Sequence, residues 1–238
     1  MAFDLYCRIP FQKTKANNPA VVDLANLLGR TPASVARKLG NFGAFDPALR
    51  KVEIKGLTHT SKLDREIWEE FNADWNGLVW EATQLHRKFE CPVQAVVPLV
   101  RPSGPSEKMR VTKQRVHQAF FRDAVLSSYE ATCCITGLAI RECLIASHIV
   151  PWSEDERFRT DPANGLCLSA TFDRLFEAGW MTVTQDLVVR LSSLVMNSRS
   201  AVNQNLVCCY HDRPIRKPHK FLPSLERLEW HRVNRFLE

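Results

Sequence analysis

The stretch that decides the fold of this chain reads LIASHIVPW over residues 144–152 and RTDPANGLCLSATFDRLFEAG over residues 159–179. The first part is an apolar run that ends at Pro151, and it predicts a strand. The second part opens with an Asn-Gly turn and a short apolar run, and Ser169 then begins a helix that ends at Gly179. The second half of the chain is therefore built around the order strand, loop, strand, helix.

Three polar residues can converge on one side of such a unit: His148 at the end of the first strand, Asn164 at the turn and Asp173 in the first turns of the helix. A histidine with a pKa of about 6.5 can take a proton from water near neutral pH. A hard divalent cation prefers oxygen ligands such as a carboxylate. Each residue alone has a simpler explanation, as a packed histidine, a turn asparagine or a complement to the helix dipole. Hydrolysis of a phosphodiester, which needs an activated water and a neutralised phosphate, is a reaction that the three could serve together.

Two further stretches complete the pattern: CCITGL over residues 133–138 and PSLERLEWHRVNRF over residues 223–236. With them the chain resembles the HNH (ββα-metal) endonuclease superfamily, in the branch found among predicted bacterial restriction endonucleases. The resemblance covers nearly all of the second half of the chain, and the spaced set of stretches carries it.

The resemblance implies a role for each residue of the set. His148 would be the general base, Asn164 would pin the loop between the strands, and Asp173 would ligate a single Mg²⁺ or a similar ion such as Mn²⁺. Many HNH enzymes have an acidic residue or a second histidine directly before the base, and here that position is Ser147, a poor ligand when neutral. Glu177, one helical turn after Asp173, is a candidate to complete the ligand set. The departure at Ser147 also leaves open a weakly active site.

The first half of the chain reads as helical. Two helices are predicted, one over residues 21–28 and one from Pro32 to about Leu39. A turn separates them, and Thr31 can cap the second helix. A helix-turn-helix needs a small residue, a turn glycine and a buried branched residue, and Ala25, Gly29 and Val35 stand at these positions. An ordinary helical hairpin explains the same pattern equally well. A longer helix is expected from Asp64, with one apolar face made by Trp68, Phe71, Trp75, Leu78 and Val79.

Basic residues in both halves are candidates for contact with DNA. Arg30, Arg37 and Lys38 favour a DNA-binding role for the first half, with the helix at residues 34–41 in the major groove. Arg159 and Arg174 are candidates for contact with phosphates in the second half. The net charge of +6 suits a polyanionic partner, but many proteins without such a partner are equally basic.

The segment 91–110 contains four prolines and a glycine, and it predicts a linker. We therefore expect an α+β protein with a mainly helical DNA-recognition domain at 1–90, as a helix-turn-helix or winged helix, and an HNH nuclease domain at 111–238.

The chain has no apolar run of membrane-spanning length and no secretory signal, so we expect it in the cytoplasm. Its eight cysteines contain no CxxC pair, which argues against a zinc ribbon and fits reduced thiols.

The expected function is that of a metal-dependent endonuclease of double-stranded DNA in a bacterial restriction or antiviral defence system, with modified DNA as one target. A homodimer is expected, because a nuclease with one site normally needs two copies to cut both strands. Two alternatives remain open. One is a DNA-binding regulator that keeps the HNH fold with weak catalysis, and the other is a nuclease effector switched on by a ligand sensed in the first half.

Overall fold

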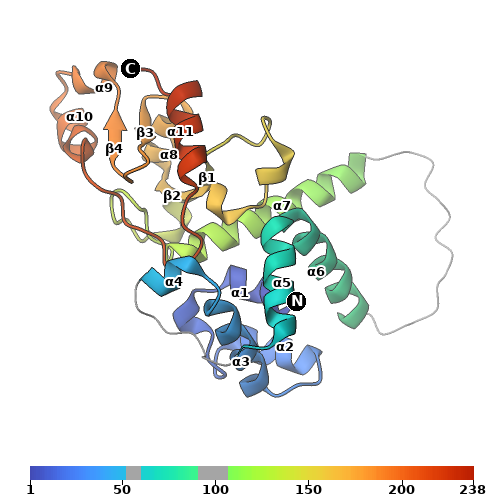
Figure 1. The fold of residues 1–238 in the computed structure, drawn as a ribbon. Helices are drawn as coiled ribbons and strands as arrows, with labels where there is room; N and C mark the ends of the chain where they lie inside the picture. The colour runs from blue at the N-terminus through green and yellow to red at the C-terminus, as the bar shows by residue number, and fades with distance from the viewer. Residues whose placement is uncertain (52–59, 91–106) are drawn as a thin grey trace. The chain divides into compact units, whose positions relative to one another are not determined.

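The computed structural model describes residues 1–51, 60–90 and 107–238, with side chains described for 1–50, 60–89 and 115–238 (Figure 1). The chain divides into two compact units, residues 1–123 and residues 124–238. The boundary between them falls inside helix α7 (Glu107–Ser128). Most of the predicted linker lies outside the described residues, so the domain limits 1–90, 91–110 and 111–238 remain predictions.

The described part of the first unit is helical. Its helices before α7 are α1 (Ala2–Arg8), α2 (Pro19–Leu27), α3 (Pro32–Gly43), α4 (Pro47–Lys51), α5 (Lys62–Ala73) and α6 (Trp75–Glu90). The core is aromatic and is centred on Phe3, whose ring centroid lies 5.0 Å from that of Phe42, 5.3 Å from Trp68 and 5.9 Å from Trp75. Rings from α1, α3, α5 and α6 thus pack together, and this packing accounts for the apolar face predicted around Trp68 and Trp75.

Helices α2 and α3 lie where the sequence predicts a helix, a turn and a second helix. Gly29 in the turn has a φ of +61°, a conformation that favours glycine. The Thr31 hydroxyl accepts a hydrogen bond from the Ser34 amide at 3.3 Å and caps α3. Ala25 and Val35 are buried where the two helices meet. The structure therefore contains the predicted helix, turn and second helix.

The single long helix predicted from Asp64 is wrong, because the structure has two helices there. Asp74 leaves the helical conformation, with φ −136° and ψ 80°, and its Oδ1 accepts a hydrogen bond from the Gly77 amide at 2.8 Å. Asp74 thereby ends α5 and caps α6. A Cβ atom at Gly77 would lie 2.3 Å from the Asp74 carboxylate, so a larger residue there would displace the carboxylate from its capping position.

The second unit carries the predicted order of strand, strand and helix. Strands β1 (Leu144–His148) and β2 (Gly165–Ser169) are antiparallel, with His148 opposite Gly165, and α8 (Ala170–Glu177) follows β2 directly. A second antiparallel pair is formed by β3 (Met181–Val183) and β4 (Val189–Leu191). The remaining helices are α9 (Ser193–Met196), α10 (Ala201–Leu206) and α11 (Leu225–Asn234).

His231 ties α11 to both α8 and β3. Its ring stacks on Phe176 with centroids 3.7 Å apart, its Nε2 lies 3.2 Å from the Phe176 carbonyl oxygen, and its Nδ1 lies 2.9 Å from the Thr182 hydroxyl. Because a carbonyl can only accept, Nε2 carries the proton and Nδ1 accepts from Thr182. Burial lowers the pKa of His231 to about 4. The neutral imidazole is thus part of the core that supports α8.

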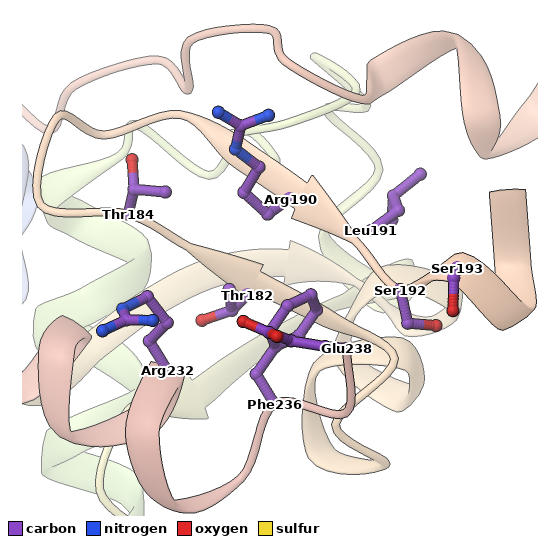
Figure 2. Close-up of a pocket in the computed structure, with 9 residues that line it drawn as sticks. All are labelled: Thr182, Thr184, Arg190, Leu191, Ser192, Ser193, Arg232, Phe236 and Glu238. Carbon is purple, nitrogen blue, oxygen red and sulfur yellow. The ribbon is translucent and has the colours of Figure 1, made fainter.

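A hollow of about 330 Å³ lies between the β3–β4 hairpin and the end of α11 (Figure 2). Its two guanidinium groups are already paired with acidic neighbours, Arg190 with Asp212 and Arg232 with Glu229. The positive charge of both arginines that line this hollow is therefore already neutralised.

Two expectations from composition can be compared with the described residues. All seven cysteines in the described part of the chain are free thiols. None of the helices described is both long and apolar enough to cross a membrane.

Candidate active site

His148 stands at the end of β1 with its orientation set by a backbone carbonyl. Its Nε2 lies 3.1 Å from the carbonyl oxygen of Arg159, and its ring meets the edge of Trp152 at a centroid distance of 5.7 Å. Because the carbonyl can only accept, Nε2 must carry the proton and Nδ1 holds the lone pair of the neutral ring. The geometry thus selects one tautomer, in which Nδ1 is the basic nitrogen.

The electrostatics around His148 favour the neutral imidazole. Burial lowers the pKa of His148, and the hydrogen bond to the Arg159 carbonyl acts in the opposite direction with a smaller effect. A histidine with a pKa below its ordinary value is unprotonated near neutral pH and is ready to accept a proton.

Asn164 closes the loop between β1 and β2. Its side chain is buried, and its Oδ1 accepts from the Val150 amide at 2.9 Å. Its Nδ2 donates to the carbonyl oxygens of Val150 at 3.0 Å and of Phe158 at 3.2 Å. The backbone carbonyl of Asn164 also accepts from the Ile149 amide at 2.8 Å. This arrangement fits the loop-pinning role that the sequence leads us to expect.

Asp173 lies in α8, which packs against β1, and its side chain is buried beside Ser147. Burial raises the pKa of Asp173, the Ser147 hydroxyl lowers it, Glu177 raises it and Arg174 lowers it. The Ser147 hydroxyl is itself buried and makes no hydrogen bond of good geometry, so it acts on the Asp173 carboxylate only as a weak partner.

These two side chains fit a hard divalent cation with few protein ligands. A carboxylate and a hydroxyl are oxygen donors of the kind that Mg²⁺ takes, with water completing its shell. A cation would compensate the buried charge of Asp173 and give the Ser147 oxygen a partner. In the parts of the chain whose side chains are described, no group of three or more His, Cys, Asp and Glu residues is arranged to hold a metal. Any ion here would therefore depend largely on water and substrate for its coordination.

The other candidates of the second unit are engaged in local contacts. Glu177 and Arg174 are exposed and pair with each other at 3.4 Å. The Arg159 guanidinium bonds the Trp152 carbonyl at 3.0 Å, pairs with Glu156 at 2.8 Å and lies over the Trp152 ring. Arg159 therefore folds back on its own loop, and the part of it that reaches His148 is the backbone carbonyl.

The three basic candidates of the first unit differ from one another. Arg30 and Arg37 are exposed. Lys38 forms an ion pair at 2.5 Å with Asp64, a fully buried carboxylate that also accepts from the Asn41 amide group at 2.6 Å. These hydrogen bonds lower the pKa of Asp64 against the opposing effect of burial. Lys38 thus holds α3 against α5, a structural task that the sequence does not reveal.

Two further residues help to hold the loop and are not predicted from the sequence: Asp161 within it and Arg227 in α11. They form an ion pair at 2.6 Å between the loop and α11. Asp161 stands directly before a proline and accepts from the Ala163 amide, which is the signal of a helix cap. Arg227 lies within the closing stretch at 223–236, where no single feature distinguishes it from the other arginines of that stretch.

The second unit is similar to a known family. Residues 133–184 match the model of the family described as HNH endonuclease, and the segment contains β1, β2, α8 and β3. It includes His148, Asn164 and Asp173, and it supports the resemblance drawn from the sequence. A comparison with curated proteins found no match to the chain.

Proposed function

We propose, from the match of residues 133–184 to the HNH endonuclease family model, that this chain is a metal-dependent endonuclease of double-stranded DNA with His148 as its general base. The observation that supports the proposal best is the contact between Nε2 of the half-buried His148 and the Arg159 carbonyl at 3.1 Å. That contact leaves Nδ1 as the proton acceptor.

In the proposed reaction, Nδ1 of His148 takes a proton from a water molecule as the water oxygen attacks phosphorus. The bond between phosphorus and the 3′ oxygen breaks, and the proton resides on an imidazolium whose Nε2 still donates to the Arg159 carbonyl. Asn164 keeps the loop closed, so that the carbonyl stays in place. A divalent ion held by Asp173 and the Ser147 hydroxyl would supply positive charge to the phosphate and the leaving oxygen.

The test is DNA cleavage by the purified full chain in Mg²⁺ or Mn²⁺. We expect His148→Ala to lower the cleavage rate by about 10²-fold or more, the usual contribution of a general base. The matched control is His219→Ala, which removes an imidazole that pairs with Glu130 at 3.4 Å. Cleavage that survives His148→Ala would refute the catalytic proposal. The same conclusion would follow if the wild-type chain cleaved no DNA in either Mg²⁺ or Mn²⁺.

We further propose a role in a bacterial restriction or defence system, with modified DNA as one substrate. This proposal rests on the resemblance to predicted restriction endonucleases. It is tested by comparing cleavage of modified and unmodified DNA of the same sequence. If both strands are cut, a homodimer is expected, and sedimentation of the chain with and without DNA would reveal it.

One observation favours a second candidate, a DNA-binding regulator with weak catalysis. The position before the proposed base is a neutral serine, and it lies beside the buried carboxylate of Asp173. A salt-sensitive gel shift without nicking would support the regulator over the nuclease.

A further inference from the structure

The proposed base depends on a carbonyl that belongs to an irregular loop. Arg159 lies between β1 and β2, directly after a short 3₁₀ helix at Glu156–Phe158. Backbone groups of loops move more easily than those of strands, because fewer hydrogen bonds hold them. If the Arg159 carbonyl moved away, Nε2 of His148 would lose the acceptor that selects its tautomer.

Arg227 holds the residues on both sides of Arg159. One of its terminal nitrogens donates to Asp161 at 2.6 Å, and its guanidinium carbon lies 3.9 Å from the centre of the Phe158 ring. Phe158 directly precedes Arg159, and Asp161 follows it by two positions. One side chain from α11 therefore braces the short segment that presents the carbonyl.

Hydrogen bonds within the same segment connect the residues that Arg227 contacts to the rest of the loop. The Phe158 carbonyl accepts from Asn164 Nδ2 at 3.2 Å and from the Asp161 amide at 3.3 Å. Asp161 accepts from the Ala163 amide through Oδ1 and from Arg227 through Oδ2. Phe158, Asp161 and Asn164 thus form one network around Arg159, and Arg227 is its connection to α11.

A backbone contact sets the position of α11 along this network. The Ser224 amide donates to the Ala163 carbonyl at 2.9 Å, and the Ser224 hydroxyl caps α11 by accepting from the Arg227 amide. The first turn of α11 is therefore fixed to the loop at a distance that lets Arg227 reach Asp161.

Burying the ion pair between Arg227 and Asp161 costs desolvation free energy. Its value to the fold is therefore more in the positions that it fixes than in net stability. The side chains of Arg227 and Asp161 are 15% and 12% exposed, and Nη1 of Arg227 is buried without a hydrogen-bond partner. Buried ion pairs contribute little net stability compared with apolar residues of similar volume. Their directional contacts do restrict the arrangement of the groups they join.

We propose that Arg227 is a positioning residue for His148: through Asp161 and Phe158 it holds the Arg159 carbonyl where it selects the tautomer with the proton on Nε2. The inference rests on the proposed function for its consequence in catalysis. The tautomer itself is a property of the folded chain and can be measured without activity.

The first test is the tautomer of His148 in the full chain, read from the ¹⁵N shifts of its ring with His148→Gln for assignment. The wild-type chain should show the proton on Nε2. Arg227→Met, which keeps an apolar stem over Phe158 but removes the donors, should show a mixture of tautomers. Arg227→Lys should restore part of the wild-type signal, because an ammonium can still reach Asp161 without the planar fork of arginine. The matched control is Arg232→Met, on the same helix, which removes an exposed pair with Glu229.

The second test is kinetic. We expect Arg227→Met to lower kcat for DNA cleavage by roughly 10- to 100-fold with KM changed less than twofold, since misplacement of a base costs rate rather than substrate binding. In a His148→Ala background the same substitution should cause no further loss. If Arg227→Met does not fold, Asp161→Asn keeps a cap for Ala163 and weakens the pair, and it should produce the same tautomer change in smaller measure.

Two results would overturn the inference: an unchanged His148 tautomer in both Arg227→Met and Asp161→Asn, or an equal loss of kcat from Arg227→Met with and without His148. A wild-type chain that cleaves no DNA would refute the proposed nuclease instead. The ring shifts would still decide the role of Arg227.

Discussion

At the scale of single residues, Asn164 shows why an amide and no other side chain suits the loop. It accepts one backbone hydrogen bond and donates two, all from a buried position. A carboxylate has the same shape but cannot donate, so it would face two carbonyl oxygens with negative charge. The amide therefore matches both polarities of the backbone that it meets.

We expect Asn164→Asp to destabilise the folded chain by about 2–3 kcal/mol, the usual cost of leaving buried polar groups unpaired. Cleavage should fall with it, because the loop no longer holds the Arg159 carbonyl. Urea unfolding measures the stability. Asn17→Asp, at an exposed position in the first unit, is the control and should change stability little. A variant at 164 as stable as the control would show that the amide is not needed.

At the scale of elements, α11 does more for the site than its distance along the chain suggests. It contacts the end of α8 through His231 and the β1–β2 loop through Arg227, so it supports both the helix of Asp173 and the loop beside His148. The chain beyond α11 also comes close to the turn after α8. A Cβ atom at Gly179 would lie 2.1 Å from the Arg235 carbonyl, which explains the glycine there.

The buried imidazole of His231 makes the stability of this packing depend on pH. Its pKa is about 4 in the folded chain against 6.5 for an ordinary histidine. Between these values the unfolded chain binds more protons, so stability falls as the pH is lowered through that window and is fully present above about pH 6.5. The total effect is roughly 3 kcal/mol.

We expect His231→Phe to keep the ring packing, to be less stable at pH 7 because Phe176 and Thr182 lose a partner, and to lose stability less steeply below pH 6.5. Urea unfolding at several pH values between 7 and 4.5 measures the difference in slope. His86→Phe, in the first unit, provides the comparison. Equal slopes for the wild type and His231→Phe would contradict the assignment.

At the scale of the whole molecule, the chain joins a helical unit with basic residues on α3 and in the turn before it to a unit that matches the HNH endonuclease family over residues 133–184. The first unit offers Arg30 and Arg37 at exposed positions, whereas Lys38 is committed to Asp64. A DNA-recognition role for this unit is still a hypothesis, and these three residues allow it to be separated from a purely structural role.

We expect Arg30→Ala combined with Arg37→Ala to weaken binding of double-stranded DNA by a full chain that also carries His148→Ala. If both arginines contact phosphates, the slope of log K against log salt should fall by about 2. Gel shifts at several salt concentrations measure this change. The control pair is Lys13→Ala with Lys15→Ala, two exposed lysines of the same unit. Equal effects of the two pairs would indicate only general charge attraction.

Lys38→Ala provides a structural contrast to that test. It leaves Asp64 buried without its cation, so it should lower the stability of the first unit rather than change the salt slope.

The order of strand, loop, strand and helix around His148, Asn164 and Asp173, the two helices around Gly29 and the resemblance to HNH endonucleases could all be predicted from the sequence. These features depend on neighbouring residues: an apolar run, an Asn-Gly turn, a cap and a fixed spacing. Even so, local periodicity missed the break at Asp74, because the apolar face of α5 continues into α6 while the Asp74 side chain ends the helix.

Three features could be assigned only from the packing of the elements: the nitrogen of His148 that carries the proton, the carboxylate that pairs with Lys38, and the helix that holds the loop. Each of these depends on one contact between segments separated along the chain: Arg159 with His148, Asp64 with Lys38, Arg227 with Asp161. The physical reason is that hydrogen bonds and ion pairs act over a few ångströms in space. A pattern in the sequence shows that a polar residue needs a partner, and the packing of the elements supplies it.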